Sequence, residues 1–186
     1  MKQADITGLF QAHRAGDGTA MPRAFGLLYS DLKKIAGHHV NKGLTPTLNP
    51  TSLVNELYLK LIDRSVITPN DRQHFYALAA QAMRQIVIDY VRERKAQKRG
   101  GDQEFVTVGS TQVPVESSLD NILEIERALG HLAKYDRRLV SVVECRYFAG
   151  LSEEETAQAL DSSVSTVQRD WQKVKGWLRE FIDSNS

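Results

Sequence analysis

The chain of 186 residues is long enough for one compact domain or two small ones, and its 41% hydrophobic and 25% charged residues are typical of a soluble globular protein. No apolar run approaches the length that spans a membrane, and residues 1–5 lack the apolar core of a secretory signal, so we expect a cytoplasmic protein. The single cysteine, Cys145, excludes an intramolecular disulfide and a metal site built from several thiolates.

The net charge of +1 conceals an uneven distribution along the chain. Residues 1–101 hold 15 Lys and Arg against 8 Asp and Glu, a balance of +7, whereas residues 102–186 hold 9 against 15, a balance of −6. A basic half favours a polyanionic partner. The opposite charges would also help the two halves to pack together in the free protein and mask the surfaces that bind such a partner.

The first half of the chain is predicted to be helical. Apolar residues recur at intervals of three and four between Phe25 and Ala36 and between Leu53 and Leu61. A third and longest helix is expected from about Asp71 to Arg99, because this stretch contains no Gly or Pro.

The third predicted helix ends in a strongly basic segment. Its positive charges oppose only Asp89 and Glu93. Such a segment is most often a solvated surface, but this one has enough charge to attract a polynucleotide backbone. The cations are Arg84, Arg92, Arg94, Lys95, Lys98 and Arg99.

A linker is predicted over residues 102–118. It follows two adjacent glycines, contains Gly109 and Pro114, and has many Ser, Thr and Val residues. Residues 104–108 have the composition of a short strand, but no obvious partner strand follows, so a flexible tether is expected. The predicted fold class is therefore all-α, with two small helical domains at 1–101 and 119–186 joined by a flexible linker.

The second domain is predicted to end in a helix-turn-helix. Gly150 suits the left-handed residue that closes a helix, and Ser152 with Glu155 has the spacing of a capping box. Ser163 can cap the final helix. Short capped helices also occur in ordinary helical bundles, so this pattern alone leaves both interpretations open.

The final helix has two distinct faces. An apolar stripe runs from Val164 to Phe181 in steps of three and four residues. The opposite face is polar and can reach base edges and phosphates from the major groove. It carries Ser165, Thr166, Arg169, Gln172 and Lys173.

The order and spacing of these segments resemble the extracytoplasmic-function (ECF) sigma factors of bacterial RNA polymerase, which keep only the second and fourth sigma regions. Gly16 and Asp17, followed by Ala24 and residues 29–36, are similar to the start of region two. Residues 53–61 are similar to its polymerase-binding helix. Residues 74–99 resemble the segment that melts and reads the promoter's −10 element. Residues 166–171, with 177–178, are similar to the recognition helix of region four, in the variant found in a sub-group of ECF-like sigma factors. The resemblance covers nearly the whole chain.

This resemblance implies roles for particular residues. The helix at 53–61 would bind the clamp helices of the polymerase's largest subunit, with Asn55, Glu56 and Lys60 exposed for contact. The six cations named above would hold the −10 DNA. The final helix would lie over the −35 element, where Asp170 replaces the basic residue usual in the family and would repel phosphate. The residues expected to contact the −35 element are Ser165, Thr166, Gln168, Arg169 and Lys173.

The main departure from the family pattern lies just before the predicted polymerase-binding helix. ECF sigma factors ordinarily carry acidic residues there, whereas this chain reads Asn49-Pro50-Thr51-Ser52. Asn49 suits an N-cap and Pro50 the first helical position, so Thr51 and Ser52 stand in the first turn, where the helix dipole favours negative charge. We hypothesise that a Ser/Thr protein kinase activates the protein by phosphorylating Thr51, with Ser52 as second choice. If both are ordinary capping residues, binding relies on other contacts.

Two other classes of function are less compatible with the sequence. A stand-alone helix-turn-helix repressor or activator would bind a palindromic site without polymerase, but no dimerisation helix follows residues 181–183. An enzyme is disfavoured because the sequence shows no metal-ligand spacing, glycine-rich phosphate loop or nucleophile motif, and no cofactor is predicted. We expect the free protein to be a monomer.

Overall fold

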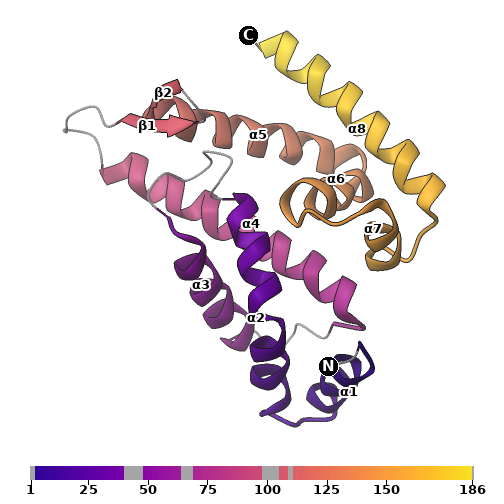
Figure 1. Cartoon of the computed structure of the whole chain (residues 1–186). Coiled ribbons are helices and arrows are strands. Elements are labelled where there is room, and N and C mark those ends of the chain that lie inside the picture. The colour runs from indigo at the N-terminus through magenta and orange to yellow at the C-terminus, as the bar shows by residue number, and fades with distance from the viewer. Residues whose placement is uncertain (1–2, 40–47, 64–68, 98–104, 109–110, 186) are drawn as a thin grey trace.

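A computed structural model of the chain describes residues 3–39, 48–63, 69–97, 105–108 and 111–185. Most of it is helical (Figure 1). The first group of helices is α1 (Gln3–Arg14), α2 (Ala20–His39), α3 (Pro50–Asp63) and α4 (Arg72–Gln97). The second group is α5 (Val115–Tyr135), α6 (Arg137–Val143), the single π-turn η2 (Glu144–Phe148), α7 (Glu153–Ala159) and α8 (Val164–Asn185). The predicted all-α fold class is confirmed, apart from one short pair of β-strands between the two groups.

The first group includes a helix that the apolar pattern did not predict. α1 packs against α2 and buries Ile6, Leu9 and Phe10. The ring centroid of Phe10 lies 5.4 Å from that of Phe75 in α4. α1 therefore completes the core of the first group. Its few apolar residues form too short a repeat to stand out in the sequence.

A polar cluster joins α2 to the first turns of α4. Asp31 accepts hydrogen bonds on Oδ2 from Arg72 Nη2 at 2.5 Å and from Tyr76 Oη at 2.7 Å, and Lys34 Nζ lies 3.2 Å from its other oxygen. Arg72 Nε donates to the Tyr76 hydroxyl at 2.8 Å. The hydrogen bond from Tyr76 is the main cause that lowers the pKa of Asp31, and burial raises the pKa of Tyr76 to about 12. The cluster thus fixes the start of α4 on α2.

The segment between the groups differs from its prediction. β1 (Phe105–Val108) pairs antiparallel with β2 (Thr111–Pro114), so the expectation that this strand lacks a partner was wrong. The two strands are separated in sequence by Gly109 and Ser110, a dipeptide typical of tight hairpins, which is the signal that could have predicted the pairing. α5 then begins at Val115, inside the range predicted as linker.

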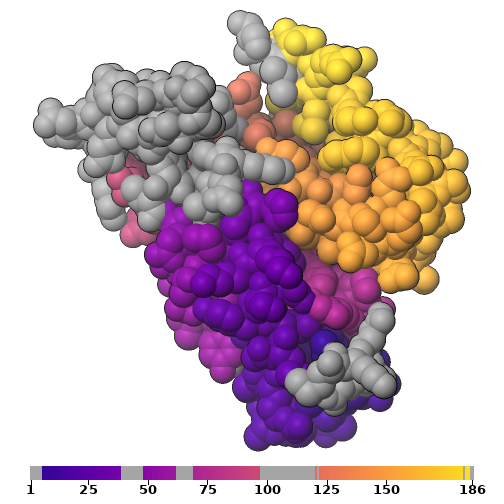
Figure 2. Space-filling model, in the orientation of Figure 1, coloured from indigo at the N-terminus to yellow at the C-terminus, as the bar shows by residue number. Residues whose placement is uncertain are grey.

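The two groups of helices lie against each other. α4 contacts α5, η2 and α7, and the buried side chains form one continuous cluster through both groups. Figure 1 shows α4 running alongside the second group, and in Figure 2 the atoms of the second group (orange to yellow) lie directly against those of the first (indigo to magenta). The sole cysteine, Cys145, is buried in η2 and lines a cavity of about 160 Å³ with His74 and Ala77 of α4.

None of the helices in the described ranges is both long enough and apolar enough to cross a membrane. Within those same ranges, no cluster of three or more His, Cys, Asp or Glu side chains is positioned to hold a metal ion.

Candidate nucleic-acid interface

The helix-turn-helix begins where η2 ends. Gly150 has a φ of +68°, as the sequence predicted, which is the conformation that lets the chain turn away from the preceding helix. The Ser152 N–H donates to Glu155 Oε2 at 2.8 Å, and the Glu155 N–H donates to Ser152 Oγ at 3.1 Å. This reciprocal pair is the predicted capping box, and it fixes the start of α7.

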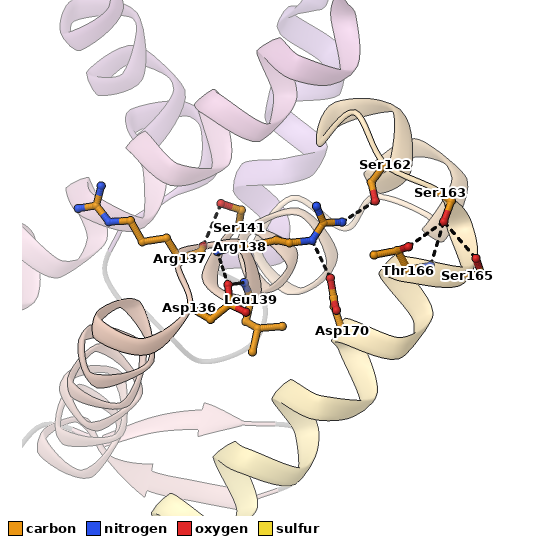
Figure 3. Close-up of polar contacts among 10 residues, drawn as sticks. All are labelled: Asp136, Arg137, Arg138, Leu139, Ser141, Ser162, Ser163, Ser165, Thr166 and Asp170. Atoms are coloured by element: carbon orange, nitrogen blue, oxygen red, sulfur yellow. Dashed lines mark hydrogen bonds and ion pairs between the residues drawn. The ribbon is translucent and has the colours of Figure 1, made fainter.

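The turn between α7 and α8 is held by serine and threonine side chains (Figure 3). Ser163 Oγ accepts the Thr166 N–H at 3.2 Å, which confirms Ser163 as the cap of α8. Its hydroxyl also lies 3.0 Å from Ser165 Oγ and 2.8 Å from Thr166 Oγ1. The first turn of α8 therefore begins with a cluster of hydroxyl groups at the positive end of the helix dipole.

α8 buries one face and exposes the other. Val167 and Val174 are fully buried. The Gln168 amide donates from Nε2 to Glu153 Oε2 of α7 at 2.7 Å, which links the two helices at their exposed edge. Four of the five predicted −35 residues are exposed, and Thr166 is half-buried. We call the five the polar row: Ser165, Thr166, Gln168, Arg169 and Lys173.

Asp170 does not belong to the exposed face, contrary to the expectation that it would repel phosphate. Its carboxylate is buried and accepts a hydrogen bond from Arg138 Nε at 2.8 Å (Figure 3). Arg138 Nη2 also donates to Ser162 Oγ at 2.5 Å. Arg138 therefore joins α6 to both the turn and α8, and Asp170 is its buried structural partner in α8. Sequence reasoning missed Arg138 because its two partners are distant along the chain.

The cations of α4 divide between two surroundings. Arg84 and Lys95 face the second group of helices: Arg84 forms ion pairs with Glu126 and Glu144, and Lys95 with Asp120. In this arrangement the charges of both cations are matched by carboxylates.

Two further cations of the basic segment, Arg92 and Arg94, lie within the described part of α4. Arg92 is exposed, with its Nη1 4.0 Å from Asp89 Oδ1. Arg94 is half-buried, and its Nη1 donates to the Tyr90 hydroxyl at 3.3 Å. Lys98 and Arg99 lie outside the described residues.

The start of α3 has the geometry that its sequence predicts. Asn49 Oδ1 accepts the Ser52 N–H at 2.8 Å, and the helix begins at Pro50. The first turn contains no acidic residue. Thr51 and Ser52 are both half-buried.

Two of the three residues of α3 predicted to be exposed for contact with polymerase are exposed, and the third, Lys60, is half-buried. Asn55 and Glu56 are exposed, and Lys60 forms an ion pair at 3.2 Å with Asp89 of α4. A groove of about 390 Å³ runs between α3 and α4, and its lining includes Ser52 and three carboxylates. Those carboxylates are Glu56, Asp89 and Glu93.

Comparison with known families identifies the chain. The family model described as "ECF sigma factor" matches residues 3–184, which includes both groups of helices and the hairpin. The chain belongs to the ECF sigma factor family. A search of curated proteins returned no match.

Membership of the ECF sigma factor family defines the general function. ECF sigma factors are alternative sigma factors that bind core RNA polymerase and promoter DNA and direct transcription initiation. They are regulatory proteins rather than enzymes. The comparison therefore favours the sigma factor over the stand-alone repressor or activator considered from the sequence.

Sequence reasoning did not predict the acidic partners of Arg84. Glu126 and Glu144 are 42 and 60 residues away along the chain. One signal was present in the sequence: Glu144 follows Leu139, Val140, Val142 and Val143, and a carboxylate that is buried among apolar residues requires a partner. The sequence could indicate that a cation was needed, but not which one.

Proposed function

We propose that this ECF sigma factor contacts promoter DNA with two separate elements. The basic segment that runs from the middle of α4 to residue 99 would bind the −10 element, through Arg84, Arg92, Arg94, Lys95, Lys98 and Arg99. The polar row on α8 would read the −35 element, and Arg169 suits bidentate contact with a guanine. The observation that carries this assignment is the exposure of the polar row on the second helix of a capped helix-turn-helix.

Core polymerase would bind at α3. Asn55, Glu56 and Lys60 supply polar groups on its outer side, facing the clamp helices of the largest subunit. The free protein would be a monomer.

Phosphorylation of Thr51 by a Ser/Thr protein kinase would switch on polymerase binding. The first turn of α3 lacks acidic residues, and a phosphate there adds about −1.5 to −2 charges where the helix dipole favours them. The groove argues for Thr51 over Ser52. Ser52 lines the groove together with three carboxylates and one cation, Lys60, which is already paired with Asp89. The remaining negative charge would repel a phosphate on Ser52, whereas Thr51 is not among the lining residues.

The test is a binding titration with core bacterial RNA polymerase. Four forms of the full chain are compared: unmodified, Thr51→Asp, Thr51→Ala, and a chain carrying phosphothreonine at position 51 by site-specific incorporation. The phosphorylated form should bind at least about tenfold more tightly than the unmodified form, since new charge-assisted hydrogen bonds contribute a few kcal/mol. Ser52→Asp is the matched control and should give little gain.

The outcomes distinguish the parts of the proposal. Equal binding by all forms would leave a sigma factor that Thr51 does not regulate. Failure of every form to bind polymerase, with tight binding of duplex DNA by the chain alone, would instead favour a stand-alone helix-turn-helix regulator.

A further inference from the structure

Arg84 stands near the middle of α4 with its guanidinium directed at the second group of helices. Nη1 pairs with Glu126 of α5, and Nη2 donates to Glu144 Oε1 of η2 at 2.9 Å. The guanidinium carbon also lies 6.0 Å from the ring centroid of Phe148. One cation on α4 thus contacts two separate elements of the other group.

These ion pairs lie in largely apolar surroundings. Val87 and Ile88 follow Arg84 on α4, and all three line a small pocket together with Ile122 and Phe148 of the second group. The side chain of Arg84 is 15% exposed and that of Glu144 is 7% exposed. A break in this cluster would leave an uncompensated charge in a buried position, which is strongly unfavourable.

Even with these ion pairs formed, one polar group of the cluster has no hydrogen-bond partner among the described residues. Arg84 Nε is buried and makes no hydrogen bond to any residue in the described ranges. Burial raises the pKa of the Glu144 carboxyl above its ordinary value, although Arg84 opposes that shift. The contact between the groups is therefore specific, but part of the cost of burying these charges is not recovered.

The two glutamates occupy the donors through which Arg84 would bind a phosphate. Both Nη atoms of the guanidinium are already paired with carboxylate oxygens, which resemble phosphate oxygens in charge and geometry. The polar row on α8 is in a different position: Ser165, Arg169 and Lys173 are exposed while Arg84 is enclosed.

We propose that Arg84, Glu126 and Glu144 form a latch that holds the second group of helices over α4 and withholds this part of α4 from DNA, while the polar row on α8 stays open. This inference rests on the proposed function, because it assigns DNA contact to both elements. Separation of the two groups on polymerase would release the latch. Before that release, the free chain could bind duplex DNA through α8 but could not hold a single strand with this part of α4.

The decisive variant is the double substitution Glu126→Gln and Glu144→Gln, which removes both negative charges and leaves Arg84 buried without a counter-charge. Backbone amide hydrogen exchange is measured along residues 84–95, and binding is measured with fluorescent random-sequence DNA in single-stranded and duplex form. We expect faster exchange in this part of α4. Single-strand binding should become about tenfold tighter, because an uncompensated buried cation opens the interface and is freed for phosphate. Duplex binding through α8 should stay within about twofold.

Two further variants test the latch against simple loss of folding. Adding Arg84→Met to the double variant removes the buried cation, so slow exchange in α4 should return, while single-strand binding should not rise. Asp120→Asn breaks the exposed pair with Lys95 on the same two helices and should leave exchange in α4 unchanged, since exposed ion pairs contribute little.

If amide hydrogen exchange along residues 84–95 is unchanged in the double variant, the proposal of a latch is wrong. It is also wrong if exchange becomes faster and Arg84→Met does not reverse this, because the opening would then not come from the unpaired cation. Opening without tighter single-strand binding would overturn the claim that the latch withholds α4 from DNA. The proposed function is judged separately, by the titration with core polymerase.

Discussion

At the scale of single residues, Asp31 is a carboxylate whose charge stabilises the fold. It accepts hydrogen bonds from Arg72 and Tyr76, and the pKa of its carboxyl is below the ordinary value. The folded chain therefore binds this proton less readily than the unfolded chain. The stabilisation is complete above the unfolded pKa of about 3.9 and is lost as the pH falls through the lower, folded pKa.

Asp31→Asn should lower the free energy of unfolding at neutral pH by about 1–2 kcal/mol, because it replaces charge-assisted hydrogen bonds with neutral ones. The difference between the variant and the original chain should narrow below about pH 4. Urea denaturation at a series of pH values measures both effects. A difference that stays constant down to pH 2 would show that the charge of Asp31 does not contribute.

Asp170→Asn tests the internal position of that carboxylate. The substitution keeps one oxygen to accept from Arg138 but removes the charge, so we expect a loss of about 1 kcal/mol in the free energy of unfolding. Binding of duplex DNA by the folded variant should be unchanged. An increase in affinity, with a steeper salt dependence, would instead mean that Asp170 faces the phosphates.

At the scale of helices and strands, the sequence correctly predicted features that depend on neighbouring residues, but not contacts between residues far apart in the chain. The caps Asn49, Ser152 and Ser163 and the left-handed Gly150 depend on groups within a few residues, and the structure has all of them. The pairing of β1 with β2, the burial of Asp170 against Arg138 and the ion pairs of Arg84 depend on residues brought together by folding. A charge pattern can indicate that a partner is needed but cannot choose between cations.

Ser152→Ala should lower the free energy of unfolding by about 1 kcal/mol, because it removes one half of the capping box of α7. The midpoint of urea denaturation measures this loss. Ser184→Ala is a suitable control, since Ser184 is exposed near the end of α8 and the same substitution there should cost less than about 0.5 kcal/mol. Equal effects at the two positions would argue against a role for the cap.

At the scale of the whole molecule, the contact between the two groups of helices is both apolar and ionic. The charge balance of the two halves predicted attraction between them. The structure adds a continuous set of buried apolar side chains, with Val87, Ile122 and Phe148 at the contact. Lys95 and Asp120 form an exposed pair, whereas Arg84 and Glu144 are shielded from solvent.

Salt should therefore have a small effect on the shape of the free protein. Between about 0.1 and 1 M NaCl the Debye length falls from about 10 to 3 Å, which screens exposed pairs but affects buried ones much less. We expect the radius of gyration from small-angle X-ray scattering to stay nearly constant. A marked expansion at high salt would mean that long-range attraction between the halves, rather than the buried contact, keeps them together.

The reactivity of the Cys145 thiol should report whether the two groups of helices are in contact. Burial raises the pKa of its thiol to about 12, so almost none of it is thiolate at neutral pH while the groups are in contact. Because Cys145 lines the cavity between α4 and η2, separation of the groups would bring the thiol closer to water. It is the only cysteine of the chain, so its alkylation rate would follow that opening without any introduced label.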